Sequence, residues 1–175
     1  MSKSKNSVPL KTKILNILVP LLVGLVLSTV FKYYIISPIH VENNYMEPTY
    51  KQGDTAYVWR IFRTKNLKIG DVVLSKSPLD ANSQLLGRIV GKAGDRIEIS
   101  KRIVLRNNSP LEPNLFPMFD TNQIPMIPAG KTESDDLSAI TVPEKTFFII
   151  SDNLEIGVDS RTLGPIPENL IIGKL

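Results

Sequence analysis

The chain of 175 residues contains no cysteine and a single histidine. Without cysteine no disulfide can form, so a folded domain must be stable without one, and cysteine usage says nothing about the compartment. The histidine, His40, has no second histidine or cysteine at metal-ligand spacing, so we expect no metal site and no bound cofactor. The net charge of +4 comes from scattered lysines and not from a basic stripe with aromatics, which argues against nucleic acid as a partner.

Charge is also missing from a long segment near the N-terminus. No charged residue lies between Ile14 and Phe31, and after Lys32 the apolar run resumes at residues 33–36. At about 1.5 Å rise per residue, a helix over residues 14–36 crosses the ~30 Å hydrocarbon core of a bilayer. A cleavable secretory signal is the alternative, but this run exceeds the usual apolar region and no small-residue cleavage site follows it. We therefore predict a transmembrane anchor at residues 14–36.

The residues before the anchor predict its orientation. Four lysines and no acidic residue precede the apolar segment, namely Lys3, Lys5, Lys11 and Lys13. Positive charge favours the cytoplasmic side, so residues 1–13 should form a short cytoplasmic tail and residues 37–175 an extracytoplasmic domain. The sequence thus predicts a single-pass protein of the cell membrane, with the lipid bilayer as its first partner.

Beyond the anchor, short apolar runs alternate with turn residues. Strand candidates are residues 56–59, 71–74, 86–90, 96–99, 103–105 and 146–150. Gly-Asp pairs separate several of them, and we expect Asp54 and Asp71 to cap turns through side chain to backbone bonds. Many short strands at near-regular spacing predict a mainly β domain. Residues 110–143 contain six prolines and are expected to form an insertion or loop between two strands.

Five segments carry a resemblance to a known family. They are Asn43–Thr49 (NNYMEPT), Gly53-Asp54, Gly70–Val73, Arg88–Asp95 and Asp152–Arg161. In this order they resemble the type I (leader) signal peptidase family, and the resemblance runs from the anchor to the C-terminus. It implies a signal-peptidase-type β domain on a single N-terminal transmembrane helix.

The catalytic positions differ from that family. There, a serine before a Met-x-Pro-Thr turn attacks the peptide bond, and a lysine just before an arginine takes its proton. Serine needs such a base, and lysine can serve only if burial lowers its pKa toward neutrality. The resemblance places Tyr45 at the nucleophile position and Gly87, before Arg88, at the base position. It places Gly157 where a serine orients the lysine, and Ser151 where the family has glycine.

An active alternative uses Tyr45 itself as nucleophile, with Lys92 or Lys76 as base. The unperturbed pKa of a phenol is about 10, and its oxygen would lie several ångströms from that of a serine. Displacements of about 1 Å are enough to impair attack geometry, which disfavours this alternative.

Other residues are assigned structural roles by the resemblance. Arg88, Asp152, Asn153, Asp159, Ser160 and Arg161 are expected to form the ion-pair and hydrogen-bond network of the site; scattered surface charges are the alternative. Met46 and Pro48 should flank a groove that takes an extended peptide by strand addition. The Tyr45 amide is expected to face the oxyanion site, and its ring could fill the pocket for a small substrate residue.

These expectations predict a catalytically inactive homologue of signal peptidase. It would bind exported precursor peptides or modulate an active paralogue. Two alternatives remain open: an active membrane endopeptidase that removes signal peptides with a non-standard nucleophile and base, and a membrane-tethered scaffold.

Overall fold

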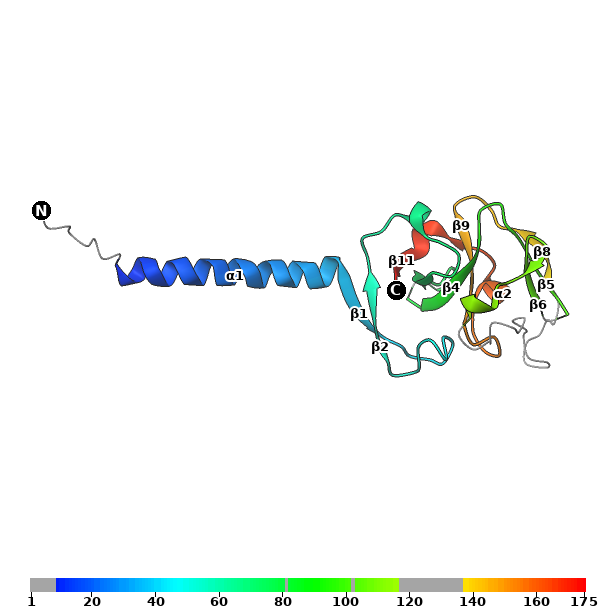
Figure 1. The fold of residues 1–175 in the computed structure, drawn as a ribbon, viewed down its shortest axis with the longest axis horizontal. Coiled ribbons are helices and arrows are strands. Elements are labelled where there is room, and N and C mark those ends of the chain that lie inside the picture. Colours follow the sequence, from blue (N-terminus) through cyan, green and yellow to red (C-terminus); the bar gives the residue numbers. More distant parts are fainter. Residues whose placement is uncertain (1–8, 81, 102, 117–136) are drawn as a thin grey trace, which may run out of the picture.

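The computed structural model describes residues 9–80, 82–101, 103–116 and 137–175. A single long helix, α1 (Leu10–Tyr34), extends from one end of a β domain (Figure 1). With 25 residues it is about 37 Å long, enough to span a bilayer. It begins earlier than the predicted anchor, because Lys11 and Lys13 are good helix formers and the helix continues back to Pro9, its N-cap.

The domain contains two antiparallel sheets. The seven-stranded sheet has the order β1-β2-β11-β3-β4-β9-β10, and the four-stranded sheet has the order β7-β6-β5-β8. The strands of the first are β1 (Ile36–His40), β2 (Thr55–Trp59), β3 (Val72–Lys76), β4 (Gln84–Lys92), β9 (Thr146–Ile150), β10 (Ile166–Pro167) and β11 (Ile171–Lys174). Those of the second are β5 (Arg96–Ser100), β6 (Ile103–Arg106), β7 (Ser109–Pro110) and β8 (Leu137–Thr141).

All six predicted strands are confirmed, as β2, β3, β4, β5, β6 and β9. The other five strands, β1, β7, β8, β10 and β11, are not among the predicted ones. β1 has the sequence Ile-Ser-Pro-Ile-His, and its proline is tolerated because β1 pairs only with β2 and lies at the sheet edge.

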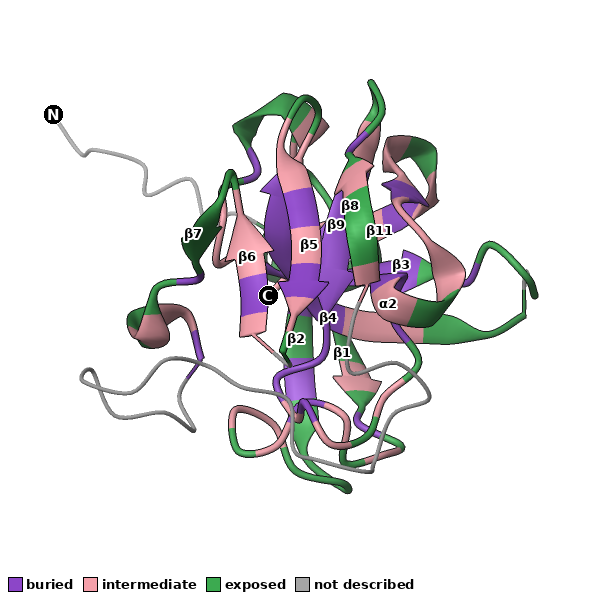
Figure 2. Ribbon diagram, turned by 90° about the vertical axis from the view of Figure 1, so that its right-hand side faces the viewer, coloured by how far each residue is buried: buried purple, intermediate pink, exposed green. Residues whose placement is uncertain are grey.

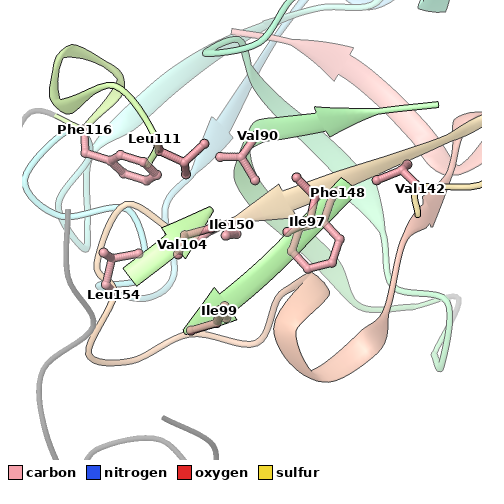
Figure 3. Packing of buried hydrophobic residues seen from close by; sticks show 10 residues of the cluster. All are labelled: Val90, Ile97, Ile99, Val104, Leu111, Phe116, Val142, Phe148, Ile150 and Leu154. Atoms are coloured by element: carbon pink, nitrogen blue, oxygen red, sulfur yellow. The ribbon is translucent and has the colours of Figure 1, made fainter. Parts of the chain in front are cut away.

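One hydrophobic core lies between the two sheets. Figure 3 shows Phe148 and Ile150 of β9 facing Ile97 and Ile99 of β5. The burial pattern of β5 alternates as expected for a strand with one face in the core (Figure 2). A second cluster lies around Ile89 and Ile149 on the larger sheet.

The proline-rich stretch contributes to this core at its described ends. Leu111 and Phe116, just after β7, pack against Val90 (Figure 3), and Val142 follows β8. A 3-10 turn, Pro113–Leu115, lies between Leu111 and Phe116. Residues 117–136, most of the predicted insertion, lie outside the described residues.

Three turns share the sequence Lys-x-Gly-Asp. In each, the glycine has φ of +86° to +90°, a conformation that glycine adopts without a Cβ penalty. The aspartate Oδ2 of Asp54, Asp71 or Asp95 accepts a hydrogen bond from the lysine N–H three residues earlier, at 2.8 to 2.9 Å. The predicted capping by Asp54 and Asp71 is therefore confirmed, and Asp95 repeats it.

Candidate functional site

The segment of residues 149–153 contacts Tyr45, Gly87 and Gly157, the three positions that the resemblance relates to catalysis. β9 ends at Ile150, and the chain then turns through Ser151, Asp152 and Asn153. Its side chains and backbone contact the loop that contains Tyr45, strand β4 and the turn that contains Gly157. The β4–β9 pairing sets these contacts, with Arg88 opposite Ile150 and Ile89 opposite Ile149.

Tyr45 lies in the loop between β1 and β2, and its backbone is tied down on both sides. Its carbonyl accepts a hydrogen bond from Asn153 N–H at 2.9 Å. Its N–H donates to Asn43 Oδ1 at 3.2 Å. The expectation of an amide facing an oxyanion site is thus wrong for this conformation, because the Asn43 side chain already accepts from it. The Tyr45 ring is half-buried.

The space at Gly87 is already occupied. Gly87 is buried on β4, opposite Val73 of β3. A Cβ added there would lie 2.4 Å from Ile149 Cγ2 and 3.3 Å from the Ile150 carbonyl oxygen. Ile149 is β-branched and stiff about χ1, so it cannot simply swing aside. Gly87, which the resemblance places at the base position, therefore has no room for a side chain as it stands.

Ser151 and Gly157 fit together as a pair. Gly157 has φ of +140°, and a Cβ there would lie 2.4 Å from Ser151 Oγ and 2.8 Å from Ser151 Cβ. Ser151 is fully buried, and its Oγ has no hydrogen-bond partner among the described residues. By the resemblance, position 151 corresponds to a glycine and position 157 to a serine. In this chain the Ser151 side chain lies where a side chain on residue 157 would be.

Arg88 and Asp152 form a buried bidentate ion pair. Arg88 Nε donates to Asp152 Oδ1 at 2.7 Å and Nη2 to Oδ2 at 2.5 Å, and the two side chains are 10% and 0% exposed. Arg88 Nη1 also donates to the Gly70 carbonyl at 2.7 Å. Thr49 Oγ1 donates to Asp152 Oδ2. The pair thus joins the Tyr45 loop, β4 and the turn after β9. Sequence reasoning missed Thr49 and Gly70, since only the folded chain brings them to Arg88.

A second ion pair completes the network. Arg161 Nε and Nη2 donate to the two oxygens of Asp159 at 2.9 and 2.7 Å, and Nη1 donates to the Leu154 carbonyl at 2.9 Å. Asp159 Oδ2 accepts a hydrogen bond from Ser151 N–H at 2.9 Å. Ser160 Oγ accepts one from Ile149 N–H, also at 2.9 Å. These residues therefore support the backbone of β9 and the turn after it. The alternative, that they are scattered surface charges, is wrong.

A groove lies beside these positions. A pocket of about 410 Å³ is lined by the segment before Tyr45 and by the start of β4, including Val41, Asn43, Gln84 and Leu86. The pocket touches Asn43, two residues before Tyr45, and Leu86, which precedes Gly87. Met46 is fully buried and Pro48 exposed, so Met46 anchors the loop and does not line the groove.

The same part of β4 has an open edge. β3 pairs with β4 from Gln84 to Arg88, whereas β9 pairs with it only from Arg88 onward. Within the described strands, nothing pairs with the other side of Gln84–Gly87. Ile89 N–H donates to the Asp71 carbonyl, so by alternation Gly87 and Leu85 face β3, while Leu86 and Gln84 present their N–H and C=O groups to the open edge.

The two lysines considered as bases lie elsewhere. Lys92 is at the far end of β4, five residues from Gly87, or about 16 Å along the strand. Lys76 is exposed at the end of β3, opposite Gln84. Neither makes a hydrogen bond to Tyr45 in the part of the chain that the structure describes.

The fold defines a mainly β domain that follows a long N-terminal apolar helix. A family model described as "Signal peptidase, peptidase S26" matches residues 14–175, and the chain belongs to this family. Signal peptidase IB of Staphylococcus aureus (strain COL) is 27% identical over 173 residues, covering 95% of this chain and 89% of that protein.

The chain is also similar to two further proteins. Probable signal peptidase I-1 of Synechocystis sp. is 24% identical over 164 residues, covering 87% of this chain and 76% of that protein. A crystal structure of a signal peptidase I from Enterococcus faecalis V583 has a TM-score of 0.46 and 22% identity, covering 63% of this chain and 97% of that one. With its N-terminal apolar helix, this family member is a single-pass membrane protein.

Proposed function

We propose that this chain binds the extended leader peptides of exported proteins without cleaving them. The observation that carries this proposal is the open edge of Gln84–Gly87 beside a groove of about 410 Å³, next to positions that hold Tyr45 and Gly87. An added strand is held mainly by main-chain hydrogen bonds, so binding does not require the catalytic side chains.

The lack of cleavage follows from the side chains at the site. Tyr45 brings a phenol with no base hydrogen-bonded to it among the described residues, and a nucleophile of this kind needs one within about 3 Å. Ile149 Cγ2 occupies the space that a base on residue 87 would enter. The names of the relatives favour activity, and a cleavage assay with the wild-type chain decides between the two.

The proposed orientation follows the lysines. Lys11 and Lys13 lie in the first turns of α1, and Lys3 and Lys5 lie outside the described residues. Positive charge before the helix favours a cytoplasmic N-terminus. The β domain would then meet leader peptides on the extracytoplasmic side, where it would compete for them with an active paralogue.

Peptide binding is tested with a fluorescent leader peptide and the full chain in detergent micelles, by anisotropy. Strand addition uses the N–H groups of alternate peptide residues. Two peptides are compared, one N-methylated at the odd-numbered residues and one at the even-numbered residues. Only the peptide whose methyl groups block the N–H groups used in pairing should lose binding. Equal loss for both peptides, or for neither, would exclude strand addition.

A matched pair of variants locates the site. Leu86→Asn changes a groove residue, and Leu79→Asn makes the same change at an 81% exposed position outside it. Leu86→Asn should weaken peptide binding by about tenfold, the effect of losing roughly 1.4 kcal/mol of apolar contact, and Leu79→Asn should leave it unchanged. No binding by the wild type would favour a membrane-tethered scaffold.

A further inference from the structure

A pocket with two basic side chains lies at the corner between α1 and β1. It has a volume of about 740 Å³. Ser28, Thr29 and Lys32 line it from α1, Ser37 from β1, and Arg60 from the end of β2. With Tyr33, two cationic side chains and four hydroxyl-bearing side chains therefore border one pocket.

Arg60 is held in place at this corner. Its N–H donates to the Ile35 carbonyl at 2.9 Å, and its Nε donates to Ser37 Oγ at 2.8 Å. These bonds leave its two terminal nitrogens available as donors. Among the described residues, no carboxylate pairs with Arg60 or with Lys32. The pocket thus presents uncompensated positive charge with a fixed guanidinium, which suits a phosphate group.

The pocket lies at the level of the membrane surface. α1 ends at Tyr34, and β1 begins at Ile36, opposite Trp59 of β2. Tyr33 and Tyr34 are 74% and 71% exposed, and Trp59 is 49% exposed. Exposed aromatic residues at the end of a membrane helix mark the headgroup region, where the phosphates of lipids lie. A phosphate at this level comes from a lipid more readily than from a soluble ligand.

We infer that Lys32 and Arg60 bind the phosphate of an anionic phospholipid at the end of α1 where the β domain begins. Basic pockets at this depth recognise anionic headgroups, and each cation near such a surface contributes about a fivefold change in affinity. A zwitterionic headgroup should bind less well, because it carries a cationic group and the described lining of the pocket has no carboxylate to pair with it. This inference is independent of whether the chain cleaves or binds leader peptides.

Trp59 supplies the readout, because it is the only tryptophan of the chain and lies next to Arg60. The full chain is reconstituted in phosphatidylcholine vesicles, and a minor fraction of spin-labelled phosphatidylglycerol or spin-labelled phosphatidylcholine is added as a quencher. Selective occupation of the pocket predicts that Trp59 is quenched at a several-fold lower mole fraction of labelled phosphatidylglycerol than of labelled phosphatidylcholine.

The variants separate this pocket from general surface charge. Lys32→Gln/Arg60→Gln should abolish the preference, and Arg63→Gln/Lys65→Gln, which removes the same charge from exposed residues outside the pocket, should retain it. Lys32→Gln alone should weaken it about fivefold, and this change on α1 breaks no described bond of the β domain.

Three results would overturn the inference. They are equal quenching by the two lipids, a preference that survives in Lys32→Gln/Arg60→Gln, and a preference lost equally in Arg63→Gln/Lys65→Gln. Inorganic phosphate in the millimolar range gives a further decision. If it displaces labelled phosphatidylglycerol at constant ionic strength, the pocket is a site for a soluble phosphate and not for a lipid.

Discussion

At the scale of single residues, Arg88 is the side chain with the most partners at the site. It binds Asp152, the Gly70 carbonyl and Thr49, so one guanidinium joins three other segments. Removing it leaves the Asp152 carboxylate fully buried with no cation beside it. Buried pairs broken on one side are costly for this reason.

We therefore predict that Arg88→Ala lowers the free energy of unfolding by about 3–5 kcal/mol. Chemical unfolding of the full chain in detergent, followed by circular dichroism, measures the change. Arg96→Ala is the matched control, because Arg96 and Glu98 form a pair that is 42% and 27% exposed, and its loss should cost less than about 1 kcal/mol. Similar effects of the two variants would contradict a special role for Arg88.

The Ser151–Gly157 contact gives a second prediction at this scale. Gly157→Ala should destabilise the protein by about 1–3 kcal/mol, because a Cβ would meet Ser151 Oγ and the residue has φ of +140°. Adding Ser151→Gly removes the contact and should restore part of the stability, although the unusual φ remains. If Gly157→Ala alone unfolds at the wild-type temperature, the two residues are not coupled.

At the scale of elements, the Lys-x-Gly-Asp turn before β5 contains a titrating group. Burial raises the pKa of Asp95. Hydrogen bonds from Arg106, the Lys92 amide and Asn107 together lower it by more than burial raises it, so the pKa lies below the ordinary value. A lowered pKa means that the carboxylate stabilises the fold above the unfolded-state pKa of about 4, and that this contribution is lost as the pH falls through the folded-state pKa.

Asp95→Asn should accordingly lower the stability by about 1 kcal/mol at pH 7, with a shrinking difference from the wild type below about pH 4. Thermal unfolding of both proteins between pH 3 and pH 7 follows this. A difference that stays constant over that range would mean that the charge of Asp95 is not what stabilises the turn.

Particular elements show what sequence alone can and cannot provide here. Gly53, Gly70 and Gly94, each followed by aspartate, predict turns because the turn is a local structure. β1 escapes prediction because Ser37, Pro38 and His40 give no apolar alternation, and the strand exists through its pairing with β2. The contact of Ile149 with Gly87 depends on the β4–β9 register, which no local pattern fixes.

At the scale of the whole molecule, the chain has the β fold of its family, and the proposed loss of the catalytic pair is tested by introducing that pair. Tyr45→Ser and Gly87→Lys would supply a serine and a lysine at the positions that the resemblance assigns to nucleophile and base, but the new lysine would collide with Ile149. We predict that this double variant shows little or no leader-peptide cleavage and that adding Ile149→Ala makes cleavage measurable, since nucleophile and base act as a unit. Mass spectrometry of the peptide products compares the two variants.

Tyr45→Ser/Ile149→Ala, which lacks the base, is the control and should remain silent. Efficient cleavage by the double variant without Ile149→Ala would show that Ile149 gives way and that the collision has no consequence. A silent triple variant that is folded and still binds the peptide would mean that the site has diverged beyond these three positions.

We propose above all that the natural chain binds leader peptides without cleaving them. The most direct measurement incubates the purified wild type with a leader peptide in detergent, beside Tyr45→Phe, and analyses the products by mass spectrometry. We predict an intact peptide with both proteins. Cleavage at the leader junction by the wild type that Tyr45→Phe abolishes would contradict the claim and establish Tyr45 as a nucleophile.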